Sequence, residues 1–192
     1  MAFIKKIIDF IKFKNKKEQL YKSNKKEILL EILKCIVNED KSILEEIERC
    51  TKNPLTYYEI HKSRYEDRGI EKDDEIDKIQ WIGMIDCLLE NNYVVELDFK
   101  CEKEDFISLF KETKGFRKNG LFINSSLLNS EEYITEWCKA LDEEWKDKGL
   151  CIIALDINSD SYIIFVGELK ILYTLGDLAQ KIDQRISLAQ KM

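Results

Sequence analysis

The carboxylates and the lysine around the C-terminal apolar runs are the residues of this chain best suited to chemistry. Asp156 and Asp160 follow one apolar run, and Glu168-x-Lys170 ends the next. A metal-dependent nuclease would use such carboxylates to hold Mg²⁺ and the lysine to position the attacking water. Glu-x-Lys occurs four times in this chain, however, so this short motif supports only an alternative hypothesis.

The same turn also resembles the first half of a calcium-binding loop, through Asp156-x-Asn158-x-Asp160. The sixth position is Ser161, where the loop needs Gly for its sharp turn, and the twelfth is Gly167 in place of a bidentate Glu. Side chains of this kind also cap tight turns with their own hydrogen bonds. A capped turn is therefore the favoured interpretation.

Other catalytic and metal-binding patterns are missing from the sequence. His61 is the single histidine and has no ligand or base at a useful spacing, so a surface or helix-capping role is expected. The cysteines include no Cys-x-x-Cys pair, which predicts buried, reduced thiols in a cytoplasmic protein without metal or cofactor. They are Cys35, Cys50, Cys87, Cys101, Cys138 and Cys151.

Charge is distributed unevenly along the 192 residues, whose formal net charge is −6. Residues 1–17 carry six lysines and one aspartate, so this leader is +5 and the remainder is −11. Nucleic-acid binding requires a clustered positive surface, and an acidic body fits a basic protein partner better. We therefore expect a basic protein partner and no nucleic acid.

The densest negative charge lies in residues 66–77, the acidic segment, which holds seven carboxylates against Arg68 and Lys72. Such a segment must face solvent, where complementary charge accelerates encounter and selects partners. Further carboxylates, at the expected strand ends, would repel one another unless a cation or backbone amides met them. The predicted partner-binding residues are Glu71, Asp73, Asp74, Glu75, Asp77, Asp98, Asp156 and Asp160.

Three segments show the hydrophobic patterns of strands. Residues 150–156 and 162–166 are apolar runs joined by a polar turn, which predicts a buried hairpin. Residues 93–100 alternate apolar and charged side chains, the pattern of a half-buried strand. The brief apolar piece 121–123 is a further candidate strand.

The remaining segments have helical spacing. Asn53-Pro54 is expected to end one helix, and Asn129 with Glu132 resembles a capping box for a helix reaching Lys148. A final amphipathic helix is expected from Gly176 to Gln190. The predicted helices cover about residues 24–37, 43–52, 56–67, 75–91, 102–114, 129–148 and 176–190.

Residues 1–17 form the pattern of a basic amphipathic leader helix. Packing on its own domain is the favoured interpretation, and weak membrane-surface contact, as in an adaptor, is the alternative. No apolar stretch is long enough to cross a bilayer.

The order of these elements predicts an α+β, helix-rich single domain over residues 18–192 with a three- to four-stranded sheet covered by helices. Its helical part would span 18–92 and its sheet-containing part 93–192. No linker or repeat separates them.

Several motifs resemble an uncharacterised bacterial family, a domain of unknown function, over about residues 75–192. They are Trp81-Ile-Gly-Met-Ile-Asp86, Glu96-Leu-Asp98 and Asp160-Ser-Tyr162. The resemblance implies a cytoplasmic bacterial protein and assigns no catalytic residues. A looser similarity links the chain to immunity proteins of toxin systems.

The leading functional hypothesis is a non-enzymatic cytoplasmic protein that binds another protein, in concrete form an immunity protein that neutralises a cationic toxin. The nuclease through Asp156, Glu168 and Lys170 and the membrane-surface adaptor through 1–17 remain alternatives. The sequence leaves the oligomeric state open.

Overall fold

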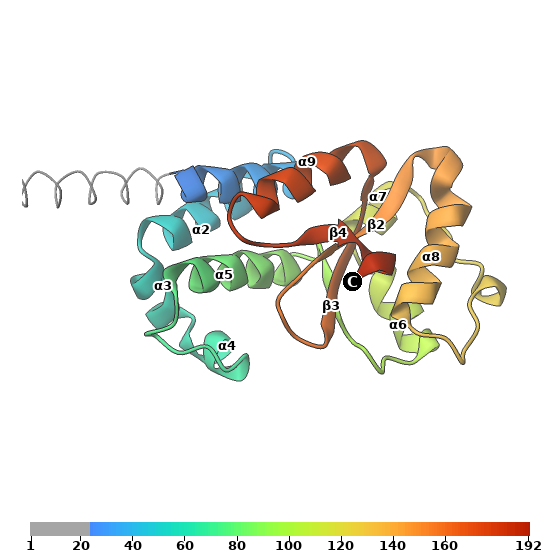
Figure 1. The fold of residues 1–192 in the computed structure, drawn as a ribbon, viewed down its shortest axis with the longest axis horizontal. Coiled ribbons are helices and arrows are strands. Elements are labelled where there is room, and N and C mark those ends of the chain that lie inside the picture. The colour runs from blue at the N-terminus through green and yellow to red at the C-terminus, as the bar shows by residue number, and fades with distance from the viewer. Residues whose placement is uncertain (1–23) are drawn as a thin grey trace, which may run out of the picture.

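The computed structural model describes residues 24–192 (Figure 1). The predicted leader helix over 1–17 and its membrane-surface contact lie outside the described residues. Within residues 24–192, no helix has both the length and the apolar character that a membrane span requires.

A four-stranded antiparallel sheet lies at the centre of the fold, with strand order β1-β3-β2-β4. The strands are β1 (Val95–Asp98), β2 (Leu150–Leu155), β3 (Ser161–Glu168) and β4 (Ile186–Leu188). Strands β2 and β3 form the predicted hairpin, in a register that pairs Leu155 with Ile163 and Leu150 with Glu168. The predicted strand over 93–100 is confirmed as the shorter β1.

Both faces of the hairpin are covered. Every residue of β2 is buried, and alternate residues enter two different hydrophobic cores. Ile153 faces the first core and Ile152 the second, as the two-residue period of a strand requires. The sheet is therefore the middle layer between two layers of helices (Figure 1).

The first core is covered by a helix over residues 24–37, by α2 (Lys41–Lys52), α3 (Pro54–Ile60), α4 (Lys62–Asp67) and α5 (Ile76–Glu90), and by α9 (Leu169–Gln180). Helix α2 ends before Pro54, as predicted. The predicted helix over 56–67 is instead two short helices, with His61 as the residue between them.

The second core is covered by α6 (Lys103–Phe110), α7 (Lys114–Lys118) and α8 (Ile134–Trp145), with short 3₁₀ turns at Ser125–Leu127 and Lys146–Lys148. Aromatic rings fill it: Phe110 stacks on Trp145 with ring centroids 6.3 Å apart, and Phe106 lies 5.3 Å from Trp137. Helix α8 buries an apolar stripe against this core, formed by Ile134, Trp137, Cys138, Leu141 and Trp145.

Three local predictions for this layer were wrong. The predicted helix over 102–114 is instead two helices: α6 ends at Phe110, and α7 begins at Lys114. Residues 121–123 form no strand. They run along the margin of the second core, where Phe122 is 70% exposed. Helix α8 begins at Ile134, where Glu136 accepts a hydrogen bond from the Tyr133 backbone N–H, and not at the Asn129–Glu132 pair.

The C-terminal helix was also placed wrongly. The predicted helix over 176–190 is replaced by α9, which starts seven residues earlier at Leu169 and ends at Gln180. Strand β4 and a 3₁₀ turn (Ala189–Lys191) follow it. Residues 186–188 form a strand and not a helix because their backbone groups hydrogen-bond to β2. This partner lies beside them only in the folded chain.

The fold class is confirmed: a helix-rich, single α+β domain with a small sheet covered by helices. Residues from both the helical part and the sheet-containing part enter the first core, so the two parts share it. All six cysteines are free thiols, and four of them are buried.

Helix α5 is the most enclosed helix, and its Gly83 permits that enclosure. A Cβ atom there would lie 2.6 Å from Tyr65 Oη and 2.9 Å from Cys50 Sγ, both in buried side chains. We predict that Gly83→Ala lowers the free energy of unfolding by about 1 to 3 kcal/mol, since overpacking a tight core forces side chains off their rotamers. Urea denaturation measures the change.

The matched control is Gly176→Ala in α9. Its added Cβ would meet only Ile186 O, at an ordinary 3.5 Å. Because Ala is the better helix former by about 1 kcal/mol, this variant should be neutral or stabilising. Equal losses in both variants would contradict the packing argument.

Asp142 ties the C-terminal turn to α8. Its carboxylate accepts hydrogen bonds from Ile152 N at 2.6 Å and from Gln190 Nε2 at 2.7 Å. Burial raises the pKa of Asp142 to about 6, although these two hydrogen bonds act in the opposite direction. The folded protein therefore holds this proton more tightly than the unfolded chain does.

We predict that the contribution of Asp142 to stability falls by up to about 3 kcal/mol as the pH rises from about 4 to about 6, because this carboxyl group must ionise while buried. Asp142→Asn cannot ionise and should remove this contribution to the profile. Its Oδ1 can still accept from Ile152 N, and the Gln190 amide must turn so that its Oε1 accepts from the new Nδ2. Thermal unfolding across this pH range tests it. An unchanged slope in the variant would refute the assignment to Asp142.

Candidate binding groove beside the acidic segment

A polar groove of about 630 Å³ lies where the acidic segment meets the start of α5 and the turn between β2 and β3. The segment joining α9 to β4 forms its third side. All three motifs singled out in the sequence reach it, through Trp81, Glu96 and Ser161. The volume is in the range of small-molecule and peptide sites.

Trp81 connects two walls of this polar groove. Its indole Nε1–H donates a 2.8 Å hydrogen bond to the backbone carbonyl of Asp156, the first residue after β2. The ring itself is 3% exposed. The hairpin turn is thereby fixed to α5, and the rim of the groove keeps its shape.

Arg68 is the central cation of the polar groove. Its guanidinium donates two hydrogen bonds to Glu96, of 3.0 and 2.7 Å, and Nε donates a third to Asp86 Oδ1 at 2.9 Å. This fork joins the end of α4 to α5 and to β1. Bidentate pairing of this type is strong and directional.

Asp86 is the buried member of this group. Burial raises its pKa, against the opposing effect of the neighbouring Arg68 guanidinium. Its second oxygen, Oδ2, is the only buried side-chain nitrogen or oxygen atom without a hydrogen-bond partner among residues 24–192. The Asp86 charge in the core therefore depends on Arg68.

A second cation, Lys25, closes the other side of the polar groove. Its ammonium lies 2.7 Å from Asp77 Oδ2 and 3.1 Å from Asp183 Oδ2. These contacts join the helix over 24–37 to α5 and to the segment before β4. The groove walls thus come from elements far apart in the sequence.

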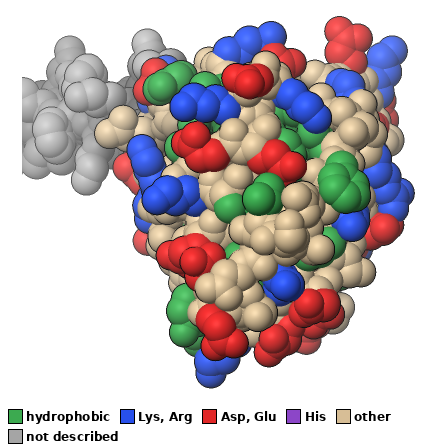
Figure 2. Space-filling view, turned by 90° about the vertical axis from the view of Figure 1, so that its right-hand side faces the viewer, with side chains coloured by type: hydrophobic (Ala, Val, Ile, Leu, Met, Phe, Trp, Pro, Cys, Tyr) green, Lys and Arg blue, Asp and Glu red, His purple; other side chains and the backbone are tan. Residues whose placement is uncertain are grey.

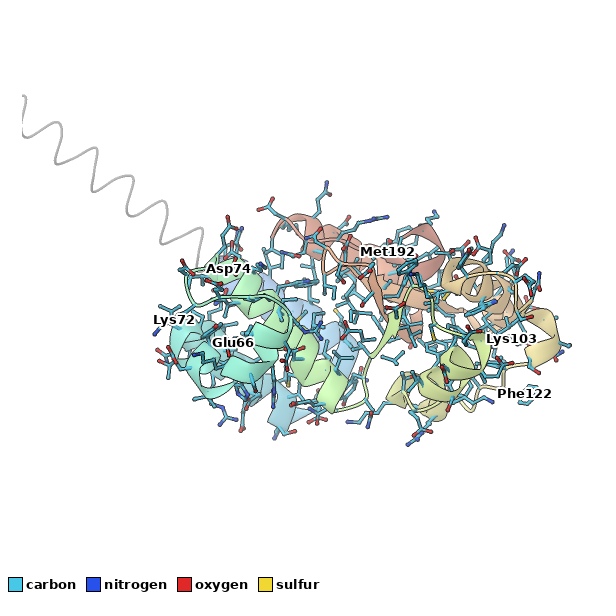
Figure 3. The ribbon with its side chains drawn as sticks, turned by 90° about the horizontal axis from the view of Figure 1, so that it is seen from below. Glu66, Lys72, Asp74, Lys103, Phe122 and Met192 are labelled. Carbon is cyan, nitrogen blue, oxygen red and sulfur yellow. The ribbon has the colours of Figure 1, made fainter. Side chains whose placement is uncertain are left out.

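The acidic segment forms a turn that its own hydrogen bonds hold, and Figure 3 labels Glu66, Lys72 and Asp74 on it. Asp74 Oδ2 accepts a hydrogen bond from Glu71 N at 2.8 Å, and Oδ1 lies 3.2 Å from Lys78 Nζ. These two contacts lower the pKa of Asp74. Lys72 pairs with Glu59 on α3.

The structure places the predicted residues in two groups. Glu75 and Asp77 line the polar groove, Glu71 and Asp73 are exposed on the same segment, and Asp74 caps its turn. Asp98, Asp156 and Asp160 lie at one end of the sheet, since Asp98 pairs with Ser161 across β1 and β3. The hairpin turn connects the two groups.

Two of the strand-end carboxylates, Asp98 and Asp156, are met by protein groups. Asp98 Oδ1 accepts from Lys100 N, and Asp156 Oδ1 accepts from Asn158 N, both at 2.8 Å. Asp156 Oδ2 also lies 3.7 Å from Arg185. No group of three or more metal-ligating side chains occurs within residues 24–192.

The calcium-loop likeness is thus a capped turn, as favoured. Asn158 adopts φ of 54°, the left-handed region that Asn tolerates, and the Asp156 side chain caps it. Ser159 Oγ accepts from Ser161 N at 3.1 Å.

The nuclease constellation is not assembled. Glu168 pairs with Leu150, and Asp156 follows Leu155 at the other end of β2. Strand β3 has eight residues, so its ends lie about 23 Å apart at about 3.3 Å per residue. Lys170 pairs with Glu168 at 2.5 Å and is far from both aspartates.

His61 lies between α3 and α4, where it contacts the Tyr57 ring and lies 3.5 Å from Glu46 Oε1. Its backbone N–H donates to Tyr57 O and Tyr58 O at the end of α3, and its side chain makes no capping hydrogen bond to α4.

Sequence reasoning missed Arg68, Glu96 and Lys25 as groove residues. The one available signal was that Arg68 is a rare cation within the acidic segment. Its partners lie 18 and 28 residues away, and only the fold identifies them.

The fold is a three-layer α+β domain with a polar groove at the turn end of its central hairpin. The family model described as "Domain of unknown function (DUF6630)" matches residues 28–189, and the chain belongs to that family. Comparisons with curated proteins and with solved structures found no match.

We predict that Arg68→Gln lowers the free energy of unfolding by about 2 to 4 kcal/mol, because it leaves Asp86 buried and unpaired. Arg68→Gln/Asp86→Asn should recover part of the loss. The raised pKa of Asp86 means that the folded state favours its proton. The loss should therefore be smaller at about pH 5 than at about pH 7.

Lys72→Gln is the control, since it breaks the exposed pair with Glu59. Such pairs contribute about 0 to 1 kcal/mol. Urea denaturation of the four proteins at both pH values makes the comparison, and a loss for Arg68→Gln no larger than that of Lys72→Gln would contradict it.

Proposed function

We propose that this protein is a non-enzymatic binding protein that recognises a basic protein partner through the acidic segment and the adjoining polar groove. In its concrete form it is a cytoplasmic immunity protein that neutralises a cationic toxin. The free state of all six cysteines fits a reducing compartment.

One observation carries this proposal. The two cations of the acidic segment are both occupied by carboxylates outside it, Arg68 by Asp86 and Glu96 and Lys72 by Glu59. Within residues 24–192, Glu71, Asp73 and Glu75 are exposed and form no ion pair. Their charge is therefore available to a partner.

The polar groove adds to this negative surface. Its lining has three cations and five carboxylates: Lys25, Arg68 and Lys78 against Asp67, Glu75, Asp77, Glu96 and Asp183. On the face in Figure 2, by contrast, acidic and basic side chains are interspersed. An inserted Lys or Arg side chain of a partner would meet carboxylates on several sides, and such complementarity governs both encounter and choice of partner.

We predict that the triple variant Glu71→Lys/Asp73→Lys/Glu75→Lys binds the partner at least about tenfold more weakly, since it reverses three unpaired charges. Immobilised protein is exposed to lysate of the source cell at low and at high salt. The captured basic protein is then purified, and its affinity for both chains is measured by calorimetry. Binding should weaken as salt screens the charges.

The control is Glu131→Lys/Glu132→Lys/Glu144→Lys, which makes the same charge change on exposed residues at and before α8. It should bind like the unmodified protein. Salt-insensitive capture, or equal weakening in both triple variants, would refute the acidic segment as the recognition surface.

A further inference from the structure

A second cavity, the basic cavity, lies at the opposite end of the β2–β3 hairpin from the polar groove. It has a volume of about 540 Å³ and is bounded by the end of the helix over 24–37, by α7, and by the junction of β3 and α9. Its floor is apolar and is formed by Ile36, Phe165, Val166 and Ile171. An apolar floor with a few polar groups at one side is typical of small-molecule sites.

The charge of this basic cavity is opposite to that of the protein as a whole. Helix α7 contributes Lys114, Arg117 and Lys118 to the lining, and Glu168 is the one carboxylate there. Glu168 itself pairs with Lys170. A positive lining therefore occurs in a chain whose net charge is −6.

Helix α7 is held firmly against the sheet. A Cβ atom on Gly115 would lie 2.6 Å from the Val166 carbonyl oxygen, so the two backbones are in direct contact. Lys114 N also donates a 2.7 Å hydrogen bond to Asn92 O. The three cations thus extend from a fixed short helix, which keeps the ordering cost of binding low.

The cations remain accessible to a ligand. Lys114 lies 4.0 Å from the Tyr93 ring centroid and 3.6 Å from Asp40 Oδ2, with its side chain 47% exposed. Arg117 pairs with Glu112, and its side chain is 58% exposed. Exposed pairs of this kind contribute about 0 to 1 kcal/mol, so an incoming anion can replace them.

We infer that the basic cavity binds a small organic anion, with its apolar body on the β3–α9 floor and its carboxylate, sulfonate or phosphate group against the α7 cations. The opposite wall is the C-terminal end of the helix over 24–37, whose carbonyls carry partial negative charge. The anionic group is therefore oriented toward α7. This site is separate from the polar groove and does not depend on the proposed function.

The chain contains a reporter for this site. Cys35 lines the basic cavity and is half-buried, whereas Cys101 is half-buried outside it. The other four cysteines are buried. A ligand in the cavity should shield Cys35 from alkylation and leave Cys101 unaffected.

The test uses 8-anilinonaphthalene-1-sulfonate, a fluorescent probe with an aromatic body and a sulfonate. We expect saturable binding to the unmodified chain, and a Kd at least about tenfold higher for Lys114→Gln/Arg117→Gln/Lys118→Gln, which removes three weak charge contacts. The probe should also slow alkylation of Cys35 by N-ethylmaleimide, with no change at Cys101.

The control triple is Lys139→Gln/Lys146→Gln/Lys148→Gln, which neutralises exposed lysines on and after α8. Thermal melts show that each variant is folded, because this probe also binds partly unfolded chains. Equal affinity for the two triple variants would overturn the inference. Failure of the probe to protect Cys35, or equal protection of Cys35 and Cys101, would also overturn it.

Discussion

Burial of the β2–β3 hairpin on both faces is the constraint on which the rest of this structure depends. Successive residues of β2 enter two separate cores, so helices must cover the sheet on each side. Neither layer can be removed without exposing half of the strand to water, and apolar burial is the main favourable term in folding. The helices that provide this cover also form the walls of both cavities.

The two cavities follow from that arrangement. The hairpin is covered on both faces along its length, and the two cavities lie at its ends. Lys25 lies at one end of the helix over 24–37 and Cys35 near the other, about 15 Å apart at about 1.5 Å per residue. The surrounding elements give the ends different charge: the acidic segment borders one cavity and α7 the other.

The sequence was sufficient to predict an element where the signal lies within the residues of that element. The apolar runs of β2 and β3, the stripe of α8 and the proline that ends α2 each specify a local structure. Strand β4 could not be found in this way, because three residues carry too little pattern and their hydrogen-bond partners are 31 or more residues away. The same limit applies to Arg68, whose structural role depends on its contacts with Asp86 and Glu96 and not on its neighbours in the sequence. The acidic segment, by contrast, was visible from composition alone.

The late position of β4 has a consequence for synthesis of the chain. Strand β2 pairs on one side with β3, which follows after a short turn, but on the other side with residues 186–188, the last strand to be made. A nascent chain that has already formed the hairpin still presents one unpaired edge of an all-apolar strand, the kind of edge that invites intermolecular pairing. Completion of the sheet, and with it protection against aggregation, must therefore await synthesis of residues 186–188.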